Sequence, residues 1–111
     1  RWDYDVFTGL YRFDDLLYGL LGTDAERECG YLWAQDDYVR EFVHPDDAQK
    51  VSEFMAYGPG NIPLDGYLQM KHRVVRRNGE TREMLVRVGK AVDSDGNVLK
   101  LVGISMDITG E

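Results

Sequence analysis

The sequence is poor in the residues from which several common kinds of site are built. Its 111 residues include one cysteine, Cys29, so the chain can form no internal disulfide and no cysteine-based metal cluster. No apolar run approaches the roughly 20 residues that a membrane-spanning helix needs, so we expect no insertion into a membrane. The first residues, RWDYD, lack the basic and then apolar order of a signal peptide. These features are consistent with a domain of the reducing cytoplasm.

Positively charged residues are also scarce. The chain has 13 lysines and arginines against 20 aspartates and glutamates, which gives a formal net charge of −7. This charge repels the phosphates of nucleic acids and the headgroups of anionic lipids, so we expect no nucleic-acid binding. The densest basic group is interpreted as the solvated face and end of a strand; it comprises Lys71, Arg73, Arg76 and Arg77.

What the sequence does contain is enough material for one core. Apolar residues make up 43% of the chain and aromatic residues 12%, and a length of 111 residues is typical of a single domain. A charged fraction of 30% argues against both disorder and a membrane protein. We therefore expect one globular domain over residues 1–111.

The C-terminal half predicts three long antiparallel strands. Between residues 66 and 77 apolar and polar side chains alternate, which places one set on a single face of a strand: Leu68, Met70, His72 and Val74. The letters NG follow and favour a tight primed turn, so residues 66–92 are predicted to form a hairpin. A second turn at residues 93–96 leads into a third strand over residues 97–108.

The N-terminal half predicts shorter elements. The opening letters WDYD alternate in polarity, and the letters TG separate them from a second short strand at residues 10–13. Thr23 and Glu26 have the spacing of a capping box, which predicts that a helix starts there. Apolar residues at irregular spacing over residues 30–40 indicate short helical turns.

The clearest helix begins at the letters HPDD. Proline loses no hydrogen bond in the first turn, and acidic residues there complement the positive end of the helix dipole. Asp46 and Asp47 are therefore interpreted as helix-initiating residues and not as a catalytic pair. The apolar residues that follow have helical spacing: Ala48, Val51, Phe54 and Met55. Gly58 is expected to end the helix.

The order of these elements and four local motifs resemble the PAS family. WDYDVFTG resembles the family's first strand and turn, and FVHPDD resembles the start of its longest helix. HRVVRRNGE resembles its arginine-bearing strand and hairpin tip, and VGISMDITGE resembles its final strand with the terminal Asp-Ile-Thr. The resemblance covers essentially the whole chain and is to the PAS/PAC sensory modules of bacterial signal-transduction proteins.

The resemblance implies an α+β fold with a five-stranded antiparallel sheet in the order 2-1-5-4-3. Short helices and one longer helix would cover one face around a small cavity. The family is sensory, so we expect a weakly homodimeric module with no catalytic or metal-binding residues of its own. It would act on an effector beyond residue 111, a diguanylate cyclase or a histidine kinase. The domain would lie in the cytoplasm, either in a soluble protein or as part of a membrane-bound sensor.

The resemblance also nominates residues. Side chains that the fold would turn toward the cavity are Trp2, Tyr4, Phe54, Met70, His72, Val86 and Ile104. The signal would leave through the end of the last strand, at Asp107, Ile108 and Thr109. Two functions stay open: sensing of a small ligand, or a ligand-free module for dimerisation or protein interaction in which large inward side chains fill the cavity.

The resemblance leaves the ligand unnamed. A small metabolite is one candidate, whereas haem is not expected, because haem-binding relatives commonly place the iron-ligating histidine on the long helix and residues 46–58 contain none. A covalent flavin switch is not expected, because Cys29 in ERECGYLW does not match the Asn-Cys-Arg-Phe-Leu-like motif of photoactive relatives. His72 is either a satisfied, half-buried strand residue or a ligand contact. A histidine that titrates near neutrality would also make the domain respond to pH.

Overall fold

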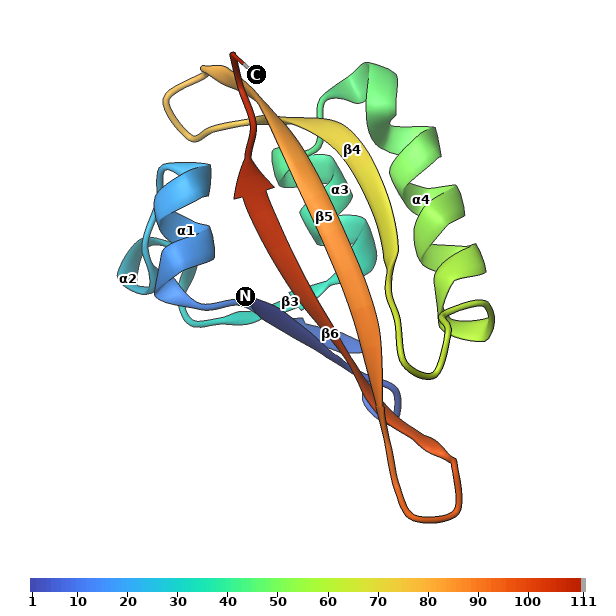
Figure 1. The fold of residues 1–111 in the computed structure, drawn as a ribbon. Helices are drawn as coiled ribbons and strands as arrows, with labels where there is room; N and C mark the ends of the chain where they lie inside the picture. Colours follow the sequence, from blue (N-terminus) through green and yellow to red (C-terminus); the bar gives the residue numbers. More distant parts are fainter. Residues whose placement is uncertain (111) are drawn as a thin grey trace.

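The chain folds around one curled antiparallel sheet (Figure 1), seen in a computed structural model that describes residues 1–110. The sheet has six strands in the order β3-β2-β1-β6-β5-β4. Their bounds are β1 Trp2–Asp5, β2 Leu10–Arg12, β3 Leu32–Ala34, β4 Leu68–Val75, β5 Thr81–Val92 and β6 Val98–Asp107. The expected order of five strands is confirmed, with one additional strand at the edge beside β2.

Four α-helices connect the strands in the middle of the chain. They are α1 Asp15–Leu21, α2 Ala25–Glu28, α3 Gln35–Phe42 and α4 Ala48–Tyr57, with 3-10 turns at Pro45–Asp47 and Gly58–Gly60 on either side of α4. Figure 1 shows α1 and α2 on one side of the sheet's long axis, and α3 and α4 on the side of β4. No helix in residues 1–110 is long and apolar enough to cross a membrane.

The additional strand corrects the prediction for residues 30–40. The first part of this range is extended as β3, and only the part from Gln35 onward is helical. β3 pairs with β2, with Tyr11 opposite Trp33. The Trp33 indole donates a hydrogen bond to the Tyr18 hydroxyl at 2.9 Å, and its ring stacks on Phe13. Three residues are too few to display an alternating pattern, so tertiary packing of Trp33 decides the conformation.

The long strands follow the predicted pattern. β4 pairs with β5 from Leu68 opposite Val88 to Val75 opposite Thr81. Alternate residues of this hairpin are buried against the helices: Met70, His72, Val74, Met84, Val86 and Val88. The hairpin of β5 and β6 projects beyond the rest of the molecule (Figure 1). Its turn is organised by Asp93, whose carboxylate accepts the backbone N–H groups of Asp95 and Asn97 at 2.9 and 3.0 Å.

Two of the helix starts differ from the prediction. Asp14 caps α1 by accepting the backbone N–H of Leu17 at 2.9 Å, and no helix had been predicted there. The capping box at Thr23 and Glu26 is wrong by one residue, because the carboxylate of Asp24 caps α2 and accepts the backbone N–H of Arg27 at 2.8 Å. An ionised carboxylate is a stronger acceptor than the neighbouring hydroxyl, which explains the shift.

The HPDD segment begins a helical region as predicted, in two steps. Residues 45–47 form the 3-10 turn, and α4 then runs from Ala48 to Tyr57 with Gly58 as its C-cap, as expected. The ring of His44 caps the turn, since its Nδ1 accepts the backbone N–H of Asp46 at 3.1 Å. Val51 is fully buried on the predicted apolar stripe, while Phe54 and Met55 are half-buried.

Candidate functional site

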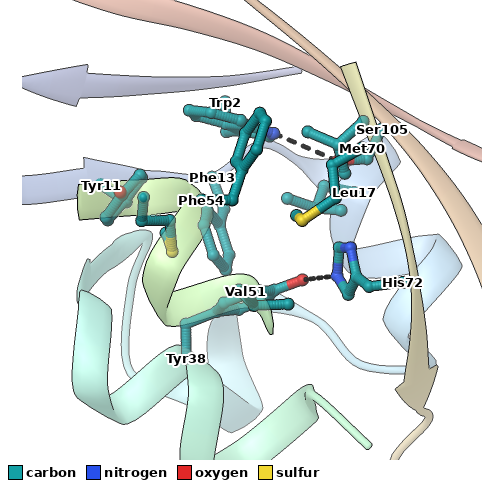
Figure 2. A pocket seen from close by; sticks show the side chains of 12 residues that line it. Trp2, Tyr11, Phe13, Leu17, Tyr38, Val51, Phe54, Met70, His72 and Ser105 are labelled. Atoms are coloured by element: carbon teal, nitrogen blue, oxygen red, sulfur yellow. Dashed lines mark hydrogen bonds between the residues drawn. The ribbon is translucent and has the colours of Figure 1, made fainter. Parts of the chain in front are cut away.

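A small cavity lies between the inner face of the sheet and the helices. Its volume is about 40 Å³, and twelve residues from all parts of the fold line it (Figure 2). They are Trp2, Tyr11, Phe13, Leu17, Tyr38, Val51, Phe54, Met55, Met70, His72, Val86 and Ser105. The wall is almost entirely apolar, and its polar groups come from His72, Ser105 and the tyrosines and Trp2.

The size of the cavity limits what it can hold in this conformation. A cavity needs about 10–15 Å³ for each water molecule, so the space suits about three water molecules or a ligand of similar size. Pockets for drug-sized ligands and cofactors span about 300–1,000 Å³. Haem or a flavin would require the walls to move apart. Cys29 is exposed at the end of α2 and is not among the lining residues, so the wall offers no thiol for a flavin adduct.

Five of the seven nominated residues line the cavity: Trp2, Phe54, Met70, His72 and Val86. Tyr4 points inward but packs on Tyr11, with ring centroids 4.6 Å apart, and lies outside the lining. Ile104 is a correction. Its neighbours on β6 point inward, which turns Ile104 to the outer face, where its side chain is 52% exposed.

The remaining lining residues were not nominated from the sequence: Tyr11, Phe13, Leu17, Tyr38, Val51, Met55 and Ser105. Val51 and Met55 were already on the predicted stripe of α4, so the helical period could have found them. Leu17 comes from α1, which is apolar on most sides, whereas Tyr38 comes from α3, where Tyr38, Val39 and Phe42 have helical spacing that could have indicated its inward face.

Trp2 connects the cavity wall to the last strand. Its indole N–H donates to the Ser105 hydroxyl of β6 at 3.1 Å. Trp2 lies opposite Gly103 in the pairing of β1 with β6, and the indole packs directly over that glycine. A Cβ atom on Gly103 would lie 2.0 Å from the ring, so only glycine permits this close approach.

His72 brings the main polar group to the cavity. The side chain is 4% exposed, and its Nε2 lies 3.2 Å from the Tyr38 hydroxyl. Within residues 1–110 its Nδ1 has no hydrogen-bond partner. Burial lowers the pKa of His72 to about 4 and raises the pKa of Tyr38, so both side chains are neutral near pH 7. The hypothesis of a histidine that titrates near neutrality is therefore wrong.

An ion pair holds the strand that carries His72. The carboxylate of Asp47 accepts three hydrogen bonds from Arg73: from the backbone N–H at 2.7 Å, from Nε at 3.1 Å and from a terminal guanidinium nitrogen at 2.8 Å. These bonds hold the pKa of Asp47 well below its usual range. Asp47 thus does more than initiate a helix, because it fixes the start of α4 to β4.

The other arginines of the basic group also have specific partners, which corrects their interpretation as a solvated face. Arg77 binds Glu28 at 2.7 Å and Glu41 at 3.2 Å. Arg76 donates from Nε to the carbonyl oxygen of Leu20, near the end of α1, at 3.1 Å. The end of β4 is therefore tied to all three short helices.

The nominated output residues are bound to the start of β5. The backbone N–H of Ile108 donates to the carbonyl oxygen of Glu83 at 2.9 Å, and the hydroxyl of Thr109 accepts the N–H of Glu83 at 2.8 Å. Asp107 lies 3.3 Å from Arg82 and accepts the N–H of Thr109 at 2.9 Å. Glu111, the last residue of this motif, lies outside the described residues.

Residues 1–110 contain no group of three or more histidine, cysteine, aspartate or glutamate side chains placed to hold a metal ion. No model of a known protein family matches the sequence. No curated protein matches it either.

Solved structures do match. A PAS/PAC sensor domain of a diguanylate cyclase from Marinobacter aquaeolei is 20% identical with a TM-score of 0.74, covering 97% of this chain and 93% of that one. A sensory box histidine kinase/response regulator from Burkholderia thailandensis is 22% identical with a TM-score of 0.68, covering 97% and 75%. The PAS domain of an HTR-like protein from Haloarcula marismortui is 21% identical with a TM-score of 0.61, covering 96% and 78%.

These similarities extend over nearly the whole chain. At this level of sequence identity they establish architecture. The chain therefore has the PAS fold.

Proposed function

We propose that the chain is a sensory input module that regulates an effector joined to it beyond residue 111. The observation that carries this proposal is the position of the cavity. Its wall includes Ser105 of β6, and the same strand continues two residues later into the output residues Asp107, Ile108 and Thr109. A change in the cavity therefore reaches the end of the sheet over a short distance.

The mechanism would be a shift between two populated arrangements of the sheet and helices. A small molecule that binds one arrangement more tightly than the other favours it by its difference in binding free energy. Coupling of about 1–3 kcal/mol is usual between such sites. The bond between Trp2 and Ser105 supports this route, because it makes the cavity wall and β6 move together.

The effector in this proposal is a diguanylate cyclase or a histidine kinase, and the chemical step belongs to it. The names of two similar structures, from a diguanylate cyclase and a sensory box histidine kinase, support that choice. We propose a cytoplasmic site of action for the same reason.

A direct test is native mass spectrometry of freshly purified protein, followed by NMR of the 15N-labelled chain with small polar and apolar molecules. Saturable shifts confined to Val51, Val86 and their neighbours are expected for a cavity that binds ligands. Uniform absence of shifts with every molecule, xenon included, would contradict a ligand-sensing role.

A second candidate function is a ligand-free interaction module. Two observations favour it: the cavity is small, and the outer face of the sheet exposes apolar side chains, with Ile104 at 52% and Leu32 at 56%. Side chains exposed on a sheet face opposite the helices suit contact with a second copy of the chain. Sedimentation of the chain over a range of concentrations separates this candidate from the first.

A further inference from the structure

The direction of the hydrogen bond between Tyr38 and His72 determines which nitrogen of the imidazole carries its proton. The Tyr38 hydroxyl has one hydrogen, and Nε2 of His72 is its partner among the described residues. If Tyr38 donates to Nε2, the neutral imidazole must carry its proton on Nδ1. If Nε2 donates instead, both the Nδ1 lone pair and the hydroxyl hydrogen of Tyr38 are left without partners. The first arrangement leaves one buried group unsatisfied and the second leaves two, so the first has the lower free energy.

His72 therefore directs an N–H donor away from Tyr38. Figure 2 shows the second ring nitrogen on the side of Met70 and Leu17, which both line the cavity. The imidazole is 4% exposed, so bulk water does not satisfy this donor. Buried N–H groups without an acceptor are rare in folded proteins because each one costs about 1–3 kcal/mol.

Ser105 offers a second donor on the same wall. Its oxygen accepts the indole N–H of Trp2, and its own hydrogen has no acceptor among the side chains of residues 1–110. The wall also carries the hydroxyl groups of Tyr11 and Tyr38, and the other atoms around the cavity are mostly carbon and sulfur. The cavity thus combines largely apolar walls with two donors, Nδ1–H of His72 and the Ser105 hydroxyl, that have no acceptor among the described residues.

We propose that the cavity binds a compact, uncharged molecule that carries a hydrogen-bond-accepting oxygen, such as a small ketone or aldehyde, and that Nδ1 of His72 donates to this oxygen. The inference rests on the proposed ligand-sensing function and specifies its ligand class. A volume of about 40 Å³ limits the ligand to a few non-hydrogen atoms. An anion is excluded because the wall contains no cation to pair with it, and burial of an unpaired charge is far too costly.

Two side chains define the route into the cavity. Phe54 of α4 and Met70 of β4 line the cavity on one side and, on the other, an open groove between α4 and β4. They separate the cavity from this groove. Methionine is flexible and Phe54 is only half-buried, so rotation of these two side chains admits a small molecule without disrupting the sheet.

The test compares propanone with 2-methylpropene, two molecules of nearly the same shape of which only propanone has an acceptor oxygen. Binding of each is measured by NMR titration of the 111-residue chain and of the His72→Phe variant. The ratio of the two affinities, propanone over 2-methylpropene, is expected to fall about tenfold or more in the variant, as a cycle of ligand and side-chain changes requires for a lost hydrogen bond. His72→Gln, which retains a donor, should keep most of the preference.

A second measurement needs no variant. Long-range 1H–15N correlation on the parent chain should show His72 protonated on Nδ1, and this resonance should move with propanone but not with 2-methylpropene. A proton on Nε2, or an unchanged affinity ratio while both molecules bind, overturns this inference and leaves ligand sensing intact. If neither molecule binds and Nδ1 contacts only ordered water, this inference is wrong; ligand sensing is wrong as well when xenon and every other molecule of the screen also fail to bind.

Discussion

The carboxylate of Asp47 binds the backbone and the guanidinium of Arg73, so the start of α4 is fixed to β4 at the residue next to His72. The backbone N–H of His44 also donates to the carbonyl oxygen of Arg73 at 3.0 Å. The backbone N–H and the carbonyl oxygen of Arg73, on the free edge of β4, therefore both have hydrogen-bond partners. One side of the cavity depends on this attachment.

Asp47→Asn should weaken the attachment and lower the urea midpoint of unfolding. The matched control is Asp46→Asn, because the Asp46 side chain is 75% exposed and makes no comparable contact with a strand. We expect a decrease several times larger for Asp47→Asn than for the control. The pKa of Asp47 is lowered in the folded state, so its contribution is present above its ordinary pKa and is lost only as pH falls below its usual titration range. Equal midpoints for the two variants would contradict the structure.

His72 should make stability depend on pH. Its folded-state pKa is about 4, against an ordinary value of 6.5, so between these values the unfolded chain binds more protons than the folded one. The contribution of the neutral His72 ring to the free energy of unfolding should therefore be fully present above about pH 6.5. The free energy of unfolding should fall by about 3 kcal/mol as pH drops to 4, at 1.36 kcal/mol per pKa unit. Asp47 raises the pKa of the His72 ring and Lys50 lowers it. Both residues are unchanged in the His72→Phe variant, with which the parent chain is compared.

The measurement is chemical denaturation of the parent and of His72→Phe at several pH values from 4 to 7. The variant should lack the part of the slope that belongs to His72, so the difference in stability between the two proteins should change across this window. A difference that stays constant with pH would mean that the imidazole is not buried.

Gly103→Ala should disturb the wall formed by Trp2. The added Cβ atom would lie 2.0 Å from the indole, so the ring must leave its position and its bond to Ser105. We expect destabilisation of about 3 kcal/mol, at the upper end of the range for overpacking, with a change in tryptophan fluorescence. Gly89→Ala on β5 is the control, since its Cβ would meet its nearest neighbour at 3.4 Å and should cost less than about 1 kcal/mol. Similar effects from the two substitutions would contradict the packing of Trp2.

The outer face of the sheet should mediate weak self-association. Ile104→Arg places a charge at the centre of this exposed face and should shift sedimentation toward the monomer without changing thermal stability. Leu64→Arg is the control, because Leu64 is 64% exposed in the loop after α4, away from the sheet face. A strict monomer at millimolar concentration for the parent chain would rule out the dimer.

The C-terminal strands were predictable because their side chains obey a period of two and their turns use residues of specific conformation. Gly79 and Gly96, for example, have φ of +87° and +84°, as the hairpin turns at NG and DG require. β3 was not predictable in this way, because three residues reveal no period. α1 was missed although Asp14 is a good capping residue before an apolar segment.

The candidate site was partly predictable, since parity alone placed Met70, His72 and Val86 on the inner face. Parity did not exclude Ile104, because it shares its parity with the apolar Val102 and Met106. Only its pairing with the exposed Arg87 of β5 places it on the outer face. The contacts that define the chemistry join residues distant in sequence: Tyr38 with His72, and Asp47 with Arg73. No local pattern reports such a contact, because it depends on how α3 and α4 pack on the sheet.

The pairing of β1 with β6 has a consequence for any polypeptide joined to this domain. β1 begins opposite Gly103 and runs antiparallel to β6, which continues past that point to Asp107. A segment that precedes Arg1 and a segment that follows residue 110 are thus directed toward the same end of the sheet. If β6 slides or twists against β1, the entering and leaving segments are displaced relative to each other, and the hydrogen bond between Trp2 and Ser105 joins the same two strands.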